Sequence, residues 1–204
     1  MVQLPMLGSF NVANAALALV LAIAAGVPAD QAAAALAQMP PVPGRMEVVP
    51  GPAGAPTVLV DYAHAPDSLA HALAALRPHV TGHLTAVYGA GGDRDHGKRR
   101  LMGVAGAKAA DRVIITDDNP RSENPAAIRA QVLAGARAAA GPDTTILEVP
   151  NRAEAIGQAI AGAQPGDLVA LLGKGHETTI DYAGQLVDHN DKAVAEAVLN
   201  EVVA

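Results

Sequence analysis

The sequence predicts an α/β fold: a Rossmann-like, mostly parallel sheet with helices on both faces and a C-terminal hairpin, preceded by two helices. Between residues 57 and 172, short apolar or β-branched runs alternate with helical patterns, which is typical of such a sheet. Two further runs flank Ala183-Gly184, a pair typical of a hairpin turn. The Pro-rich segment 40–44 separates these elements from an apolar, helical N-terminus and predicts a hinge or domain boundary.

The N-terminal part predicts two helices. The first covers residues 11–25 and ends before Gly26, because glycine is favoured just after a helix. The second starts with Asp30 as its N-terminal cap and ends near residue 39. Two helices of this apolarity cannot bury their own faces, so we expect them to need a partner.

The elements after residue 44 follow from a change in the hydrophobic period. Predicted strands cover residues 57–62, 84–88, 112–116, 144–149 and 168–172, and predicted helices cover residues 66–77, 98–110, 125–140 and 151–163. The predicted hairpin strands are 178–182 and 186–188, and a last helix covers residues 191–203.

The composition limits the class of protein. The chain has 204 residues, enough for one domain and part of a second. It has 46 alanines and 2% aromatics, so we expect a core of Leu, Val, Ile and Ala with closely packed helices. The net charge of −6 argues against a nucleic-acid partner, and the lack of cysteine excludes disulfides and thiolate sites. We see no secretion signal, and the apolar stretch 15–25 is too short for a membrane span, so we expect a cytoplasmic protein.

The expected position of a site follows from the topology. In open parallel sheets, ligands bind beyond the carboxyl ends of the strands. Polar or glycine-rich segments follow four of the predicted strands, at residues 61–64, 89–95, 117–121 and 173–177. We therefore expect these four segments to form one site.

Two of these segments are rich in glycine. The first, G-A-G-G-D-R-D at 89–95, lets the backbone approach an anion, but Arg94 breaks the dinucleotide pattern G-x-G-x-x-G, and a plain tight turn is the alternative. The basic run 98–100 after it is interpreted as a solvated helix start. In G-K-G-H-E at 173–177, the glycines around the lysine suggest an incomplete phosphate loop and Glu177 can hold a ligand ammonium, whereas a βα turn with a solvated Glu is the alternative.

The segment D-D-N-P-R at 117–121 predicts a rigid polar loop. Pro120 fixes its own φ and restricts the residue before it, so the loop presents Asn119 and Arg121. Arg suits a bidentate grip on a carboxylate. The alternative is an ordinary Asn-Pro turn with a surface Arg.

The segment D-Y-A-H at 61–64 carries an acid and a histidine. Asp61 and His64 could form an acid/base pair, a metal pair or nucleotide contacts. The alternative is a helix cap by Asp61 and a solvent-exposed His64. With no third ligand nearby, the pair is weak evidence for zinc, and we predict no metal site.

Together these segments resemble one family, the Mur ligases of cell-wall synthesis. The resemblance covers nearly the whole chain, and six motifs occur in the family's order. They are F-N-V-A-N at 10–14, P-G-R-M-E at 43–47, D-Y-A-H at 61–64, G-G-D-R-D at 91–95, D-N-P-R at 118–121 and G-K-G-H-E at 173–177. In the family, D-N-P-R is associated with meso-diaminopimelate as the added amino acid, and relatives that add lysine lack that Arg.

The resemblance implies an ATP-dependent amide-bond ligase of peptidoglycan synthesis. Such an enzyme adds meso-diaminopimelate to UDP-N-acetylmuramoyl-L-alanyl-D-glutamate. In the family, ATP converts the γ-carboxylate of the D-glutamate to an acyl phosphate, and the amine of the amino acid then displaces phosphate. The enzyme supplies positioning and charge neutralisation.

The resemblance also implies roles for individual residues, none of them catalytic. Arg94 holds the carboxylate at the reacting end of diaminopimelate, Asn119 and Arg121 hold the distal carboxylate, and the Gly173 carbonyl and Glu177 take the distal ammonium. The implied substrate-binding residues are Arg94, Asp118, Asn119, Pro120, Arg121, Gly173 and Glu177. The implied ATP-binding residues are Asn14 for adenine, Arg45 for phosphates, Asp61 for ribose, and His64 beside them.

Some parts of a Mur ligase are missing from the sequence. It has no glycine-lysine-threonine phosphate loop, no magnesium-binding Glu/His set and no lysine in a carbamylation motif. In the family these lie in the central domain, where most of the ATP and Mg²⁺ contacts are made. We therefore expect residues 1–44 to be the tail of that domain plus a hinge, and 45–204 to be the C-terminal amino-acid-binding domain. The upstream domains of the same protein are then partners, and the 204 residues alone are expected to be inactive.

Two other functions stay open. One is a ligase that adds L-lysine. The other is a non-catalytic α/β nucleotide-binding module, in which the glycine loops only cradle a ligand or form turns. A Rossmann oxidoreductase is disfavoured by the broken glycine pattern.

Overall fold

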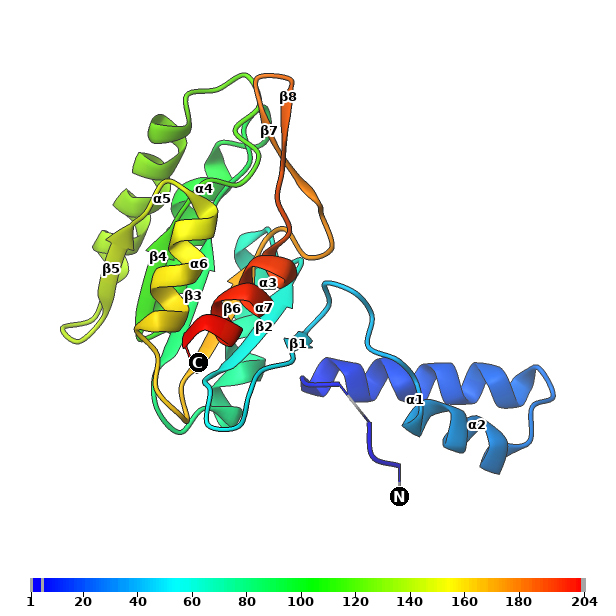
Figure 1. Ribbon diagram of the computed structural model, residues 1–204. Coiled ribbons are helices and arrows are strands. Elements are labelled where there is room, and N and C mark those ends of the chain that lie inside the picture. Colours follow the sequence, from blue (N-terminus) through cyan, green and yellow to red (C-terminus); the bar gives the residue numbers. More distant parts are fainter. Residues whose placement is uncertain (1, 5, 203–204) are drawn as a thin grey trace.

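A computed structural model describes residues 2–4 and 6–202 of the chain (Figure 1). Two helices, α1 (Ser9–Ala24) and α2 (Ala29–Ala37), come first and lie beside a larger α/β unit. That unit ends with α7 (Asp191–Val202), so residue 203 of the last predicted helix lies outside the described residues. The division of the chain into two domains stays a prediction.

The sheet has six strands in the order β1-β2-β6-β3-β4-β5. Its members are β1 (Glu47–Val49), β2 (Thr57–Asp61), β3 (Leu84–Tyr88), β4 (Arg112–Ile115), β5 (Thr145–Glu148) and β6 (Leu168–Leu172). All neighbouring pairs are parallel except β1 with β2. The prediction of a mostly parallel sheet is confirmed. Strand β1 was not predicted, because a three-residue run centred on valines beside a glutamate carries little signal until β2 offers it an edge.

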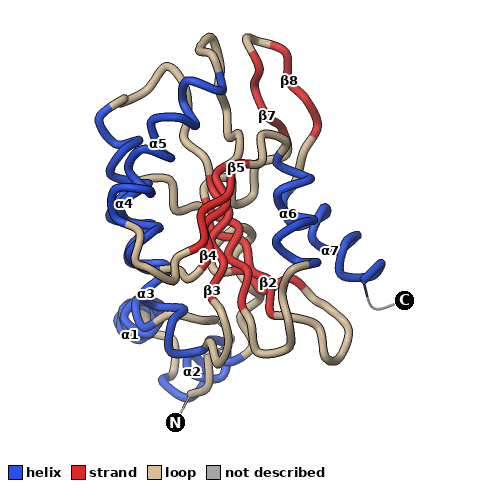
Figure 2. Tube along the Cα trace, turned by 90° about the vertical axis from the view of Figure 1, so that its left-hand side faces the viewer, coloured by secondary structure: helices blue, strands red, loops and turns tan. Residues whose placement is uncertain are grey.

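The helices form one layer on each face of the sheet, as Figure 2 shows. Helices α3 (Pro66–Leu76), α4 (Gly97–Ala109) and α5 (Pro125–Ala139) cover one face, and a short 3₁₀ turn (Arg77–His79) extends α3. Helices α6 (Arg152–Ala161) and α7 cover the other face. Each layer encloses its own cluster of buried apolar side chains. The expected coverage of both faces is confirmed.

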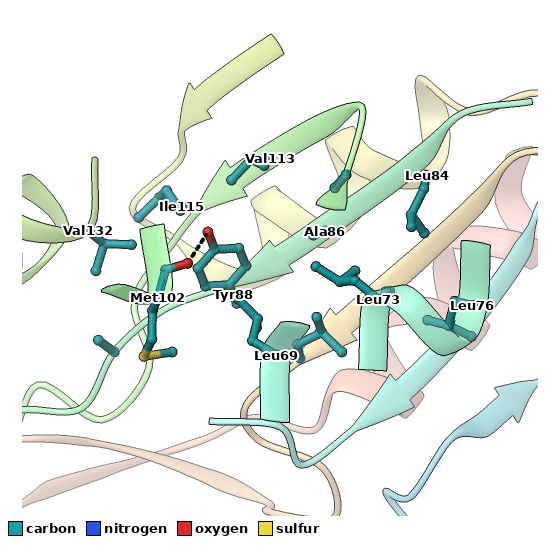
Figure 3. Close-up of a cluster of buried hydrophobic side chains, with 14 of the residues drawn as sticks. Leu69, Leu73, Leu76, Leu84, Ala86, Tyr88, Met102, Val113, Ile115 and Val132 are labelled. Atoms are coloured by element: carbon teal, nitrogen blue, oxygen red, sulfur yellow. Dashed lines mark hydrogen bonds between the residues drawn. The ribbon is translucent and has the colours of Figure 1, made fainter. Parts of the chain in front are cut away.

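The core beneath α3, α4 and α5 is made largely of aliphatic side chains (Figure 3). Leu69 and Leu73 of α3 and Val132 of α5 are among its members. Tyr88 adds one fully buried aromatic ring, and its hydroxyl donates to the Met102 carbonyl at 3.1 Å. This bond satisfies the only polar atom of the ring, and burial raises the pKa of Tyr88.

Helices α4 and α5 cross at very short range. A Cβ placed on Gly103 would clash with the backbone carbonyl of Val132, and one on Gly135 would clash with the carbonyl of Arg100. The two glycines thus allow backbone-to-backbone contact that no larger residue permits. This is the close helix packing that the composition predicts.

The hairpin consists of β7 (Thr179–Tyr182) and β8 (Gln185–Asp188), which pair antiparallel apart from the main sheet. Ala183 and Gly184 both have positive φ, as a two-residue hairpin turn requires. The hairpin is tied to the loop after β4, because Arg121 N donates to the Asp181 carbonyl and Ala183 N donates to the Arg121 carbonyl. It therefore lies at the carboxyl ends of the strands.

The N-terminal helices differ from the prediction at one cap. Helix α2 begins at Ala29 with Pro28 in the N-cap position, so Asp30 lies in the first turn and does not cap. Gly26 follows α1 with φ 94°, as expected. Several apolar side chains of α1 are exposed, including Leu17 and Val20. Within the described residues, no helix combines the length and apolarity that a membrane crossing requires.

Candidate functional site

The four loops expected to form one site do meet. They follow β2, β6, β3 and β4, which are four consecutive strands of the sheet. They enclose a cavity of about 200 Å³, the strand-end cavity. Its lining residues are Tyr62, His64, Gly89, Ala90, Gly91, Arg94, Lys98, Asp118, Asn119, Arg121 and Glu177. Five of the seven predicted substrate-binding residues are among them, whereas Pro120 and Gly173 lie in the loops behind the lining.

The loops after β3 and β4 are fastened to each other. Gly92 N donates to the Asn119 carbonyl at 2.8 Å, and the Arg121 Nη1 donates to the Gly92 carbonyl at 2.7 Å. A Cβ on Gly92 would clash with the carbonyl oxygen of Pro120. Glycine is therefore required at position 92 because two backbone segments are in contact. The sequence alone could not distinguish this packing role from anion binding or a simple turn.

Arg94 stands exposed at the rim of the strand-end cavity. The residue before it, Asp93, has φ 52° and accepts hydrogen bonds from the Ser122 hydroxyl at 2.6 Å and the Ser122 N–H at 3.1 Å. Hydrogen bonds with Ser122 hold the pKa of Asp93 below its usual value. The backbone that carries Arg94 is thus anchored while its guanidinium stays available to a ligand.

The basic run 98–100 was predicted to be a solvated helix start, but the structure differs from this prediction. Arg99 is fully buried, pairs with Glu123 at 2.7 Å, and donates to the Gly91 carbonyl at 3.2 Å. The Arg99 hydrogen bond lowers the pKa of Glu123 to about 2. Lys98 lines the strand-end cavity and donates to the His64 carbonyl at 3.0 Å. The prediction was wrong for Arg99, because a run of like charges does not reveal which members face inward, whereas Lys98 is half-buried.

Asn119 and Glu177 meet on the floor of the strand-end cavity. The Asn119 Nδ2 donates to the Glu177 Oε2 at 2.9 Å, and the Lys174 Nζ donates to the same oxygen at 2.7 Å. Burial opposes ionisation of Glu177, but these two hydrogen bonds hold its pKa below the usual range. The cavity therefore presents an ionised carboxylate.

Lys174 does not act as a phosphate-loop lysine in this fold. Its side chain is fully buried in the ion pair with Glu177 rather than extended into solvent. Gly173, with φ 109°, packs against Asp118, because a Cβ there would lie 2.9 Å from the Asp118 Oδ2. The other oxygen, Oδ1, accepts from the Asn119 N–H at 2.6 Å.

A second cavity, of about 470 Å³, lies where α1 and the 40–44 segment meet the α/β unit; we call it the N-terminal cavity. Its lining residues are Met6, Phe10, Asn11, Asn14, Val42, Arg45, Asp61, Ser68, His71 and Ala72. Three of the four predicted ATP-binding residues, Asn14, Arg45 and Asp61, are therefore together. The fourth, His64, lies in the strand-end cavity instead.

Asp61 organises the wall between the two cavities. Its carboxylate accepts from the backbone N–H groups of Met46 and Ala63, each at 2.9 Å. It does not cap α3, where the Ser68 hydroxyl accepts from the Ala65 N–H instead. The Met46 contact holds the backbone next to Arg45, which lies 4.7 Å above the ring of Tyr62.

This wall makes the two cavities neighbours. Arg45 lines the N-terminal cavity, and Tyr62, which it stacks on, lines the strand-end cavity. The Tyr62 ring also contacts His64, with ring centroids 4.6 Å apart.

Buried charged residues support the loops from behind. Arg152 and Asp191 are both fully buried and pair at 2.7 Å. Arg152 also donates to the carbonyl of Leu172, the last residue of β6, and to the carbonyl of Asp117, in the loop after β4. Tyr182 of the hairpin donates to the Asp117 carboxylate at 3.0 Å, and burial raises the pKa of that phenol to about 12. This support could not be predicted from the sequence, because the partners are far apart along the chain.

No cluster of three or more His, Cys, Asp or Glu side chains suited to a metal ion occurs in the described part of the chain.

Comparisons with known proteins agree on one family. The family model for "Mur ligase, glutamate ligase domain" matches residues 44–175. The chain is 46% identical to the UDP-N-acetylmuramoyl-L-alanyl-D-glutamate--2,6-diaminopimelate ligase of Synechococcus elongatus, covering 97% of this chain and 39% of that protein. It is 44% identical to the protein of the same name from Brucella melitensis, covering 96% of this chain and 39% of that protein. The chain thus spans about two fifths of the length of these relatives.

Solved structures give the same result. A structure of a UDP-N-acetylmuramoyl-L-alanyl-D-glutamate--2,6-diaminopimelate ligase superposes with a TM-score of 0.73 at 37% identity, covering 98% of this chain and 40% of that one. A folylpolyglutamate synthase of Mycobacterium tuberculosis, solved with ADP and AMPPCP, superposes with a TM-score of 0.61 at 25% identity. That match covers 84% of this chain and 39% of the synthase.

Proposed function

The chain belongs to the Mur ligase family, and from that premise we propose that it is part of an ATP-dependent ligase that adds meso-diaminopimelate to UDP-N-acetylmuramoyl-L-alanyl-D-glutamate. In this reaction ATP phosphorylates the γ-carboxylate of the D-glutamate, and the amine of diaminopimelate attacks the acyl phosphate and releases phosphate. The task of this chain is to bind and orient the attacking amino acid.

The observation that carries the proposal is the charge pattern of the strand-end cavity. Arg94 and Arg121 line one small cavity together with Glu177. Meso-diaminopimelate carries a carboxylate and an amine at each end, so two guanidinium groups and one carboxylate complement it. We assign Arg94 to the carboxylate at the reacting end, and Asn119 with Arg121 to the distal carboxylate.

The distal ammonium is assigned to Glu177 and the carbonyl of Gly173. Both hydrogen bonds that Glu177 accepts from side chains end on Oε2, so Oε1 is the oxygen that remains for a ligand. Asp118 and Pro120 complete the set by holding the loop that carries Asn119 and Arg121. L-Lysine has no distal carboxylate, so it would bury Arg121 without a counterion and bind less well.

ATP is assigned to the N-terminal cavity and to domains beyond this chain. Asn14 is placed on the adenine, Arg45 on the phosphates and Asp61 on the ribose. His64, on the far side of Tyr62, is near the point where the phosphate donor and the amine would meet. Mg²⁺ and most phosphate contacts belong in this proposal to an upstream domain.

The exposed apolar face of the N-terminal helices supports the proposed division into domains. Residues 1–44 are taken as the tail of the central domain plus a hinge, and 45–204 as the amino-acid-binding domain. Leu17 and Val20 of α1 are 60% and 61% exposed. A further domain of the same protein that packed on α1 would bury these side chains. The cytoplasm is the proposed location, consistent with a chain that has no cysteine.

The test uses the full-length protein with ATP, Mg²⁺ and UDP-N-acetylmuramoyl-L-alanyl-D-glutamate. We expect a new amide product, detected by mass spectrometry, with meso-diaminopimelate and little product with L-lysine. Equal turnover of the two amino acids would contradict the assigned specificity. ATP binding without any amide product would favour the non-catalytic module.

A further inference from the structure

Lys174 lies directly beneath the strand-end cavity, yet no role has been assigned to it. Its side chain is fully buried, and its Nζ lies 2.7 Å from the Glu177 Oε2 and 3.1 Å from the Asn119 Oδ1. Burying an ammonium is costly unless acceptors satisfy it, so a lysine does not take such a position by default. Both of its acceptors line the cavity.

We propose that Lys174 is a positioning residue for the amino-acid substrate: its ammonium fixes the Asn119 amide and the Glu177 carboxylate in the orientation that receives the distal end of the ligand. The inference rests on the proposed function and deepens it. It assigns to Lys174 no contact with the substrate and no part in the chemical step.

The effect on Asn119 follows from its hydrogen bonds. Its Oδ1 accepts from the Lys174 Nζ and from the Asp181 N–H at 3.0 Å, and its Nδ2 donates to Glu177. Rotating the amide by half a turn would place its NH₂ against two donors and its oxygen against a carboxylate. Lys174 therefore favours a single orientation of the Asn119 amide, in which its NH₂ group lies on the side of Glu177.

The effect on Glu177 is that its two carboxylate oxygens take different roles. Oε2 receives both the Lys174 ammonium and the Asn119 amide, which leaves Oε1 to a ligand ammonium. A carboxylate fixed by two donors loses less side-chain entropy when the ligand binds than a mobile one does. The lysine thus prepares the acceptor before the substrate arrives.

The surrounding glycines direct the lysine inward. Gly173 and Gly175, on either side of it, both have positive φ, 109° and 53°. A Cβ on Gly175 would lie 2.8 Å from the Cβ of Tyr62, so the turn packs tightly against the wall of the cavity. The Glu177 N–H closes the turn on the Lys174 carbonyl at 3.0 Å. The glycine pair therefore serves a buried lysine, not a phosphate.

The experiment compares K174M with wild type in the full-length ligase, varying meso-diaminopimelate and ATP separately. We expect KM for diaminopimelate to rise about 10- to 100-fold, as for the loss of hydrogen bonds to a charged group. KM for ATP should stay within about twofold, since the N-terminal cavity does not include Lys174. K108M, which changes an exposed lysine of α4, is the matched control and should behave as wild type.

Two further variants keep the result decisive. K174Q retains a hydrogen-bond donor without a charge, so it replaces K174M if the latter does not fold, and we expect a smaller rise of the same KM. Combined with E177Q, either variant should raise KM by less than the product of the single effects, because both disturb one oriented carboxylate.

An unchanged KM for diaminopimelate in the folded variants would overturn the role of Lys174. So would a rise shared equally by diaminopimelate and ATP, or effects that multiply independently with E177Q. A wild-type protein that forms no amide with diaminopimelate would instead refute the proposed function itself.

Discussion

Arg121 shows how one residue joins the backbone of the site to its specificity. It has φ 52°, unusual for a side chain of this size, and its backbone bonds to Asp181 and Ala183 of the hairpin. One guanidinium nitrogen is used by the Gly92 carbonyl. The remaining N–H groups face the strand-end cavity, so the fold both anchors this arginine and leaves donors for a ligand.

The first prediction is that R121M reduces the preference of the ligase for meso-diaminopimelate over L-lysine. Losing a charged hydrogen bond to the distal carboxylate should lower kcat/KM for diaminopimelate about 10- to 100-fold. Turnover of L-lysine should not fall and should rise, because the methionine removes the unpaired guanidinium that opposes lysine binding. Steady-state assays of the full-length ligase give both numbers. R137M, at an exposed arginine of α5, is the control, and an equal loss with both amino acids would contradict the assignment.

The second prediction concerns the buried pair of Asp191 with Arg152. Burial alone would raise the pKa of Asp191, but Arg152 and a hydrogen bond from His189 hold it below its usual value. A lowered native pKa means that the unfolded chain binds the proton more readily as pH falls. The pair's contribution is therefore complete above the unfolded pKa of about 3.9 and is lost as pH falls through the native value.

D191N should accordingly lower the free energy of unfolding by about 3–5 kcal/mol near neutral pH, because it leaves Arg152 buried without a counterion. The difference from wild type should shrink below about pH 4. Urea unfolding over a pH series measures it. D143N, at an exposed carboxylate, should show no such difference, and a D191N deficit that stays constant down to acid pH would refute the linkage.

At the scale of elements, the crossing of α4 and α5 gives the third prediction. A Cβ at Gly103 would meet the Val132 carbonyl and lie 2.6 Å from the Ala136 N, and backbone atoms cannot rotate away. G103A should therefore lower stability by about 1–3 kcal/mol despite the better helix propensity of alanine. In α6, Gly157 has nothing within 4 Å of its would-be Cβ, so G157A should be neutral or stabilising by up to about 1 kcal/mol. Thermal melts of both variants measure the change in Tm relative to wild type. Equal changes in Tm for G103A and G157A would contradict the packing argument.

The elements that the sequence predicted are those with a strong local pattern. Each predicted β-strand and helix of the α/β unit is present, with ends within a few residues, because buried parallel strands read as continuous apolar runs. Strand β1 was not predicted because a three-residue edge strand is too short to show a hydrophobic period. The cap by Asp30 was wrong because the N-cap position lies two residues earlier, at Pro28.

At the scale of the whole molecule, the sequence predicted the meeting of the four loops better than the side-chain contacts within them. Parallel topology alone brings the four loops to one edge of the sheet, so their meeting needed no knowledge of side-chain contacts. The burial of Arg99 and Lys174 could not be predicted, because each depends on a carboxylate brought close by tertiary folding. His64 and Asp61 line different cavities for the same reason, because neighbours on a short loop can face in different directions.

The last prediction separates binding from ligation. The residues assigned to diaminopimelate all lie in this chain, so we expect the 204 residues by themselves to bind meso-diaminopimelate, weakly, and more tightly than L-lysine. The same sequence has no G-x-x-x-x-G-K-[ST] string to hold the phosphates of ATP, so it should form no amide product. Calorimetry with each amino acid and a ligation assay on the same preparation test both halves. Robust turnover would show that the phosphate site needs no upstream domain, whereas equal heats for the two amino acids would remove the basis of the specificity, since both would then bind without using Arg121.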